Sequence, residues 1–103
     1  MTLDFFNKNI PILITGYNRP NYLKSVLDRI NSLGYSNIWI ALDGPKSYDK
    51  NDANRTNECK LLLKLYDFYD INKCLIQETN LGCKYGMATA IGWFFANNDM
   101  GII

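Results

Sequence analysis

Residues 10–20 read IPILITGYNRP, a continuous apolar run followed by a short polar loop and a proline. An apolar run without polar alternation is typical of a strand that is buried on both faces, as in a parallel sheet. Pro20 can begin a helix, because the N–H that proline lacks would have no partner in a first helical turn. The stretch therefore predicts a strand over 10–15, a loop over 15–20 and a helix from Pro20.

Apolar runs and helical patterns continue to alternate along the chain. Apolar residues spaced by three or four predict a helix from Pro20 to Gly34, where glycine ends it. We expect further strands at 37–42 and 73–77, the start of a fourth at 101–103, a polar mobile loop at 46–55, and helices at 53–69 and 84–97. This β-α-β-α-β-α-β order predicts one Rossmann-like, three-layer α/β/α domain with a mostly parallel sheet over residues 1–103.

The helical patterns also predict which side chains face the core. For the second and third helices we expect these to be Cys59, Leu62, Leu63, Tyr66 and Tyr69, and then Met87, Ala90, Ile91, Phe94 and Phe95. The three cysteines, Cys59, Cys74 and Cys83, form no CxxC pair, and we interpret each as a small buried side chain. An odd number of widely spaced cysteines indicates reduced thiols and favours a cytoplasmic location.

Composition excludes several classes of function. The chain has no histidine, so it cannot itself supply a Ser-His-Asp triad, a Cys-His pair or the usual zinc site. Its formal net charge of +1 gives no electrostatic reason to expect a nucleic-acid partner. Residues 1–9 lack the basic start and apolar core of a secretion signal, and no apolar run approaches the roughly 20 residues that span a bilayer.

Three loops follow the carboxyl ends of the expected parallel strands, so we expect them to meet at one edge of the sheet. Ligands of such folds bind at this edge. The first loop carries Thr15, Gly16, Tyr17, Asn18 and Arg19, the second carries Asp43 and Gly44, and the third carries Asn80, Gly82 and Lys84. The first helix offers its positive end to a phosphate, and the Arg19 guanidinium can grip a diphosphate. Tyr17 offers a ring on which a base could stack. These residues predict a nucleotide site.

The same residues resemble a known family. The run 11–20, the stretch 41–45 (ALDGP), the stretch 80–83 (NLGC), and the later segments 88–95 and 101–103 are similar in order and spacing to the opening of GT-A glycosyltransferases. They look most like bacterial sugar transferases related to the N-acetylglucosaminyltransferase that starts complex N-glycans. The resemblance spans nearly the whole chain and implies a nucleoside-diphosphate sugar as ligand.

The resemblance also implies roles for individual residues. Thr15, Tyr17 and Arg19 would line the nucleotide, and Asp43 would contact its base. Asn80, Gly82 and Lys84 would border the sugar-diphosphate. In that family an acidic metal-binding motif directly follows the counterpart of 101–103, and these 103 residues do not contain it. Mn²⁺ or Mg²⁺ is therefore expected only in a longer chain, and we assign no catalytic or metal-binding residue. We interpret the chain as the nucleotide-binding half of a transferase, inactive alone.

Two other interpretations stay open. A non-catalytic nucleotide-binding or interaction module with the same fold would also lack the acidic motif, and an incomplete sheet would expose an apolar edge that favours self-association. A flavodoxin-like or other nucleotide-binding domain is disfavoured, because the chain has neither GxGxxG nor GxxxxGK[ST].

Overall fold

The computed structural model describes residues 7–103, so most of the stretch 1–9 considered for a secretion signal lies outside the described residues. Strands β1 (Ile12–Gly16), β2 (Ile38–Leu42) and β3 (Cys74–Ile76) form a parallel sheet in the order β1-β2-β3. Ile102 pairs with Ile12 in a single parallel bridge. The expected fourth strand is thus reduced to one bridging residue next to β1.

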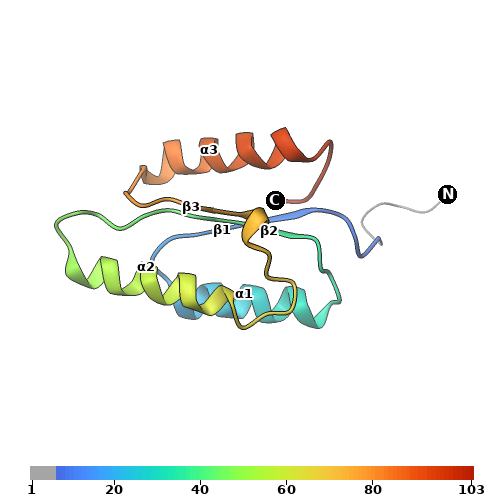
Figure 1. Cartoon of the computed structure of the whole chain (residues 1–103), viewed down its shortest axis with the longest axis horizontal. Helices are drawn as coiled ribbons and strands as arrows, with labels where there is room; N and C mark the ends of the chain where they lie inside the picture. Colours follow the sequence, from blue (N-terminus) through green and yellow to red (C-terminus); the bar gives the residue numbers. More distant parts are fainter. Residues whose placement is uncertain (1–6) are drawn as a thin grey trace.

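Helices cover both faces of this sheet. α1 (Pro20–Ser32) and α2 (Lys50–Leu63) lie on one face, and α3 (Gly82–Asn97) lies on the other (Figure 1). A short 3₁₀ helix, η2 (Ile71–Lys73), precedes β3. The predicted α/β architecture with a parallel sheet is confirmed, and the order of its regular elements is β-α-β-α-β-α. Within residues 7–103, no helix combines the length and apolar character needed to cross a membrane.

The sheet buries a separate apolar cluster on each face. On the side of α1 and α2, the cluster includes Leu27, Ile40 and Leu63, each at most 2% exposed. The smaller cluster under α3 consists of Leu13, Ala41, Ala90 and Phe94. Trp39 and Trp93 pack against this cluster and contact each other edge to face, with 5.4 Å between their ring centroids. The run 10–14 is apolar because both faces of β1 are covered there.

The polar segment 46–55, expected as a loop, is a loop only up to Asp49. α2 begins at Lys50, because the Asp49 carboxylate caps it and accepts bonds from the backbone N–H groups of Asn51 (3.0 Å) and Asp52 (3.2 Å). The helix also ends earlier than predicted, at Leu63. Our prediction of a helix over 53–69 was therefore shifted toward the C-terminus, because it followed apolar spacing and ignored capping chemistry.

The inward face of α3 was also predicted incorrectly in part. Ala90 and Phe94 are buried, whereas Met87 and Phe95 are 39% and 43% exposed. α3 carries apolar side chains on nearly all of its sides, so apolar spacing alone does not single out one face. The sheet selects the side that presents Ala90 and Phe94.

Phe94 and Phe95 give a direct test of this packing. Phe94→Ala empties a fully buried site and should cost about 3–5 kcal/mol in the free energy of unfolding. Phe95→Ala removes the same group from a half-exposed site and should cost about 1 kcal/mol. Urea unfolding followed by circular dichroism measures both values, and equal losses would contradict the placement of α3.

Candidate functional site

A cavity of about 960 Å³ lies beside β1, and we call it the β1 cavity. Residues of all three predicted loops line it: Thr15, Gly16, Tyr17, Asn18, Arg19, Asp43, Asn80 and Gly82. Its size is within the range of small-molecule sites, about 300–1,000 Å³. The parallel sheet thus brings together eight of the ten residues that the sequence singled out.

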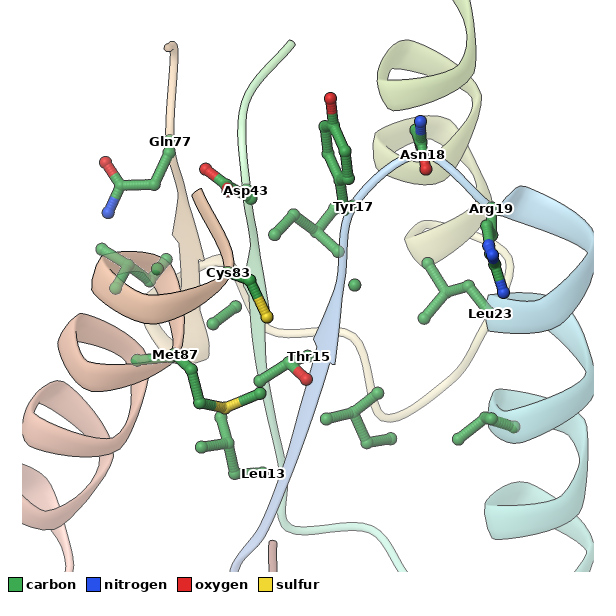
Figure 2. Close-up of a pocket in the computed structure, with 18 of the residues that line it drawn as sticks. Leu13, Thr15, Tyr17, Asn18, Arg19, Leu23, Asp43, Gln77, Cys83 and Met87 are labelled. Carbon is green, nitrogen blue, oxygen red and sulfur yellow. The ribbon is translucent and has the colours of Figure 1, made fainter. Parts of the chain in front are cut away.

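The lining changes character along β1. Figure 2 shows Tyr17, Asn18, Asp43 and Gln77 near the carboxyl ends of the strands, whereas Leu13 lies toward the opposite end. The apolar part of the lining also includes residues of α1 and α3. The β1 cavity therefore has a polar end and an apolar floor, which suits a ligand with one charged part and one flat, less polar part.

Gly44 and Lys84 do not line the cavity. Gly44 is buried, and a Cβ at that position would come within 2.6 Å of the backbone of Thr79. Its role is to let the loops after β2 and β3 approach closely. Lys84 is exposed, with its ammonium 5.8 Å from the centre of the Tyr85 ring. The structure thus gives both residues a place beside the cavity rather than in its wall.

The carboxylate of Asp43 joins the second loop to the third. Its Oδ1 accepts bonds from the backbone N–H groups of Gly44 and Leu81, both at 2.8 Å. Its Oδ2 accepts bonds from the backbone of Gly82 (3.1 Å) and the side-chain amide of Asn80 (3.3 Å). These four donors match the lone-pair capacity of a carboxylate. Asp43 therefore holds the start of α3 against the end of β2.

Asp52 has a similar place at the first loop, and the sequence reasoning missed it. This carboxylate is only 2% exposed and accepts a bond from the Tyr17 hydroxyl, one from the Asn18 amide (2.7 Å) and one from the Lys46 backbone (2.8 Å). The bond from Tyr17 and that from the Lys46 backbone hold the pKa of Asp52 below its usual range. A carboxylate three residues after the cap at Asp49 was the available signal, because this spacing marks a helix start.

The first loop is ordered by these bonds. Burial, followed by the bond to Asp52, raises the pKa of Tyr17 to about 12. The phenol therefore stays protonated near neutral pH and keeps its role as a donor. Gly16 adds a close contact, since a Cβ there would come within 2.9 Å of the Leu42 side chain. The tyrosine ring and the loop backbone are fixed before any ligand arrives.

Two cationic residues line the cavity. Arg19 and Lys46 both line it and are exposed to solvent. Among the described residues that line the cavity, Asp43 is the one with a negative charge, so the two cations outnumber it. The lining therefore favours an anionic group next to Arg19 and Lys46. Lys46 lies in the short loop before α2, where no sequence pattern singles it out.

The carboxylates at this end do not form a metal site. Asp43 and Asp52 direct their oxygen atoms at N–H and O–H donors, which leaves no free carboxylate pair for a cation. In the described part of the chain, no three His, Cys, Asp or Glu side chains gather so that they could hold a metal ion. The Mn²⁺ or Mg²⁺ implied by the resemblance is expected only in a longer chain that carries the acidic motif, and the function proposed below does not use it.

The cysteines differ in exposure. Cys59 is buried and Cys74 is half-buried, but Cys83 is exposed and lines the cavity, so its interpretation as a buried side chain was wrong. Figure 2 shows its sulfur, with that of Met87, on the side of α3 that faces Thr15. All three thiols are free. α3 starts two residues earlier than predicted, and this start brings Cys83 onto its first turn.

Comparisons with known proteins returned no match, whether with family models, with curated proteins or with solved structures. The residues of the site and the fold are therefore the grounds for assigning a function.

The contact at Gly44 can be tested against a matched glycine. Gly44→Ala should destabilise the protein by about 1–3 kcal/mol, because a methyl group would overlap the Thr79 backbone. Gly92→Ala lies in α3 with nothing within 4 Å of its added carbon and should stabilise the protein by about 0.5–1 kcal/mol. Thermal unfolding of both variants measures the difference, and a harmless Gly44→Ala would show that the two loops do not meet.

Proposed function

We propose that this chain binds a nucleoside-diphosphate sugar in the β1 cavity, as the nucleotide-binding part of a GT-A type glycosyltransferase. The observation that supports this proposal is the convergence of three loops on one cavity at the carboxyl ends of parallel strands. Open α/β sheets bind their ligands at this edge. The resemblance of the same three loops to GT-A transferases supplies the ligand class.

The diphosphate is assigned to the first loop. Arg19 carries a permanent charge with a planar fork that suits phosphate oxygens, and Lys46 adds a second cation from the next loop. α1 begins at Pro20 without a side chain that caps its first turn. Its N-terminal dipole can therefore contribute to binding of an anion.

The base is assigned to Tyr17. Its ring lines the cavity, and its hydroxyl is engaged by Asp52, so the ring offers a fixed face for stacking. A contact between Asp43 and the base stays a prediction. The bonds that Asp43 makes to the third loop support the site in either case, because they hold Asn80 and Gly82 at the cavity wall.

For these residues we propose binding of the nucleotide sugar and no transfer of the sugar. Sugar transfer to a hydroxyl acceptor, the reaction that the resemblance implies, uses a metal ion held by free carboxylates to stabilise the departing diphosphate. Among residues 7–103, the carboxylates near the cavity are engaged elsewhere. We therefore propose transfer only for a chain that also carries such carboxylates.

Calorimetric titration with UDP and GDP, each with and without Mn²⁺, tests the binding site. We expect weak UDP binding that does not depend on Mn²⁺, because Asp43 and Asp52 are not free to hold the ion. Arg19→Ala should weaken binding by about 1.5–3 kcal/mol through loss of a charged hydrogen bond, which is about tenfold or more.

The matched control for this titration is Arg29→Ala. Arg29 lies in the last turn of α1 and does not line the cavity, so its removal should leave the affinity unchanged. Absence of binding by the folded wild-type chain would refute the nucleotide site. Equal losses for the two arginine variants would indicate a general charge effect instead.

A second candidate function is self-association as an interaction module, and the outer edge of β1 favours it. In the described part of the chain, β1 pairs on that side only through the bridge between Ile12 and Ile102, so residues 14–16 have no strand partner there. The stretch 10–17 carries no charged side chain, although charges usually protect sheet edges. A second copy of the chain is the partner that would cover this edge.

Light scattering after size-exclusion chromatography tests this candidate over a dilution series. Self-association through the edge predicts a dimer that dissociates on dilution, and Ile103→Lys should shift it to monomer by placing a charge next to β1. Ile71→Lys is the control, because Ile71 is similarly exposed (70%, against 61% for Ile103) but lies in η2. A monomer at every concentration would exclude this function.

A further inference from the structure

Asp52 is unusual among the side chains that the structure buries. In the described residues 7–103, the buried polar or charged side chains are Asp52 and Thr56, and only Asp52 carries a charge. No lysine or arginine of this part of the chain forms an ion pair with it. Burying a carboxylate without a countercharge is costly unless its lone pairs are satisfied by hydrogen bonds. The three donors around Asp52 therefore offset the cost of burying its charge, and their positions in the fold indicate what the residue does.

These donors come from two different loops. The Tyr17 hydroxyl and the Asn18 amide belong to the loop after β1 and are 35 and 34 residues away from Asp52 in sequence. The third donor is the backbone N–H of Lys46, in the loop after β2. A single carboxylate at the start of α2 thus connects both loops. All three donor residues also line the β1 cavity.

We propose that Asp52 is a positioning residue that holds Tyr17, Asn18 and the Lys46 backbone in the arrangement that receives the nucleotide. This inference rests on the proposed function and adds to it a residue that does not line the cavity. Asp52 does not touch the ligand. It acts through the ring of Tyr17 and through the relative position of the two loops that carry Arg19 and Lys46.

Asp52→Asn is the informative substitution because it keeps the shape of the side chain. Asparagine has one acceptor oxygen, and its amide nitrogen can only donate. It cannot accept the three bonds on two oxygen atoms that the carboxylate accepts, so at least one of the three bonds is lost and the negative charge beside Tyr17 is removed. Asp43, Tyr48 and Lys46 are the other charged or titratable groups that act on Tyr17 or Asp52, and the substitution leaves them in place.

A second tyrosine–aspartate pair provides a matched control. The Tyr66 hydroxyl donates to Asp28 at 2.5 Å, and burial, followed by this bond, raises the pKa of Tyr66 to about 12, as for Tyr17. Asp28 is exposed on α1, and neither residue lines the β1 cavity. Asp28→Asn therefore removes the negative charge beside a tyrosine hydroxyl outside the proposed site, together with the ion pair between Asp28 and Lys24.

The experiment combines tyrosine titration with UDP binding. Selective ¹³C labelling of the seven tyrosine rings lets NMR follow each phenol separately. In Asp52→Asn, Tyr17 should ionise at lower pH than in the wild type while Tyr66 is unchanged, and UDP affinity should fall about tenfold. In Asp28→Asn, Tyr66 should ionise at lower pH, and UDP affinity should stay within about twofold of the wild type.

The other possible results of the tyrosine titration and the UDP binding each test a different part of the proposal. An unchanged Tyr17 titration in Asp52→Asn would overturn the contact, and a lowered titration with wild-type UDP affinity would overturn the positioning role. If the wild type binds no UDP, the proposed function fails, while the Tyr17 titration still decides whether Asp52 holds the loop. Should Asp52→Asn not fold, Tyr17→Phe removes the phenol donor without changing α2. It should also weaken UDP binding, and an unchanged affinity would overturn the proposal.

Discussion

The parallel pairing of β1 with β2 determines which loops can meet. Gly16 lies opposite Leu42 at the end of the ladder, and the pairing continues one step further because the Asp43 N–H donates to the Gly16 carbonyl at 2.9 Å. Gln77 repeats the arrangement after β3, with its N–H 3.0 Å from the Leu42 carbonyl. Each strand therefore ends level with its neighbour, so the residues that follow emerge at one edge. The β1 cavity is a consequence of this alignment.

Backbone pairing brings the loops together, but two carboxylates fix them. Asp43 connects the end of β2 to the start of α3, and Asp52 connects the start of α2 to the loop after β1. Both use N–H or O–H donors and neither forms an ion pair in the described part of the chain. Hydrogen bonds to a charged group are directional and about twice as strong as neutral ones, so they suit a site that must hold its shape.

The sequence was sufficient for those features that depend on local patterns. Apolar runs identified the strands, and Pro20 and Gly34 marked the ends of the first helix, where Gly34 has the positive φ of 83° that favours glycine. The prediction of a loop was wrong over 50–55, because a polar helix start has no apolar spacing and is recognised only by its cap. The predicted inward face of the third helix was also wrong for Met87 and Phe95, since an almost entirely apolar helix gives no preferred face.

In the candidate site, too, some features follow from local sequence patterns and others do not. The eight predicted residues that line the cavity sit at strand ends or helix starts, which the pattern locates. The roles of Asp43 and Asp52 depend on partners 34 to 39 residues away, and no local pattern identifies such partners. Gly44 was placed in the site because of its position next to Asp43, whereas its contact with Thr79 gives it a packing role.

Cys83 gives this small domain a natural reporter position. It is the exposed member of three free thiols, it sits on the first turn of α3, and it lines the wall of the β1 cavity. A fluorophore attached to this sulfur would sense a molecule entering the cavity without any engineered residue. Because Cys59 and Cys74 are more protected, labelling would favour one defined point on the protein.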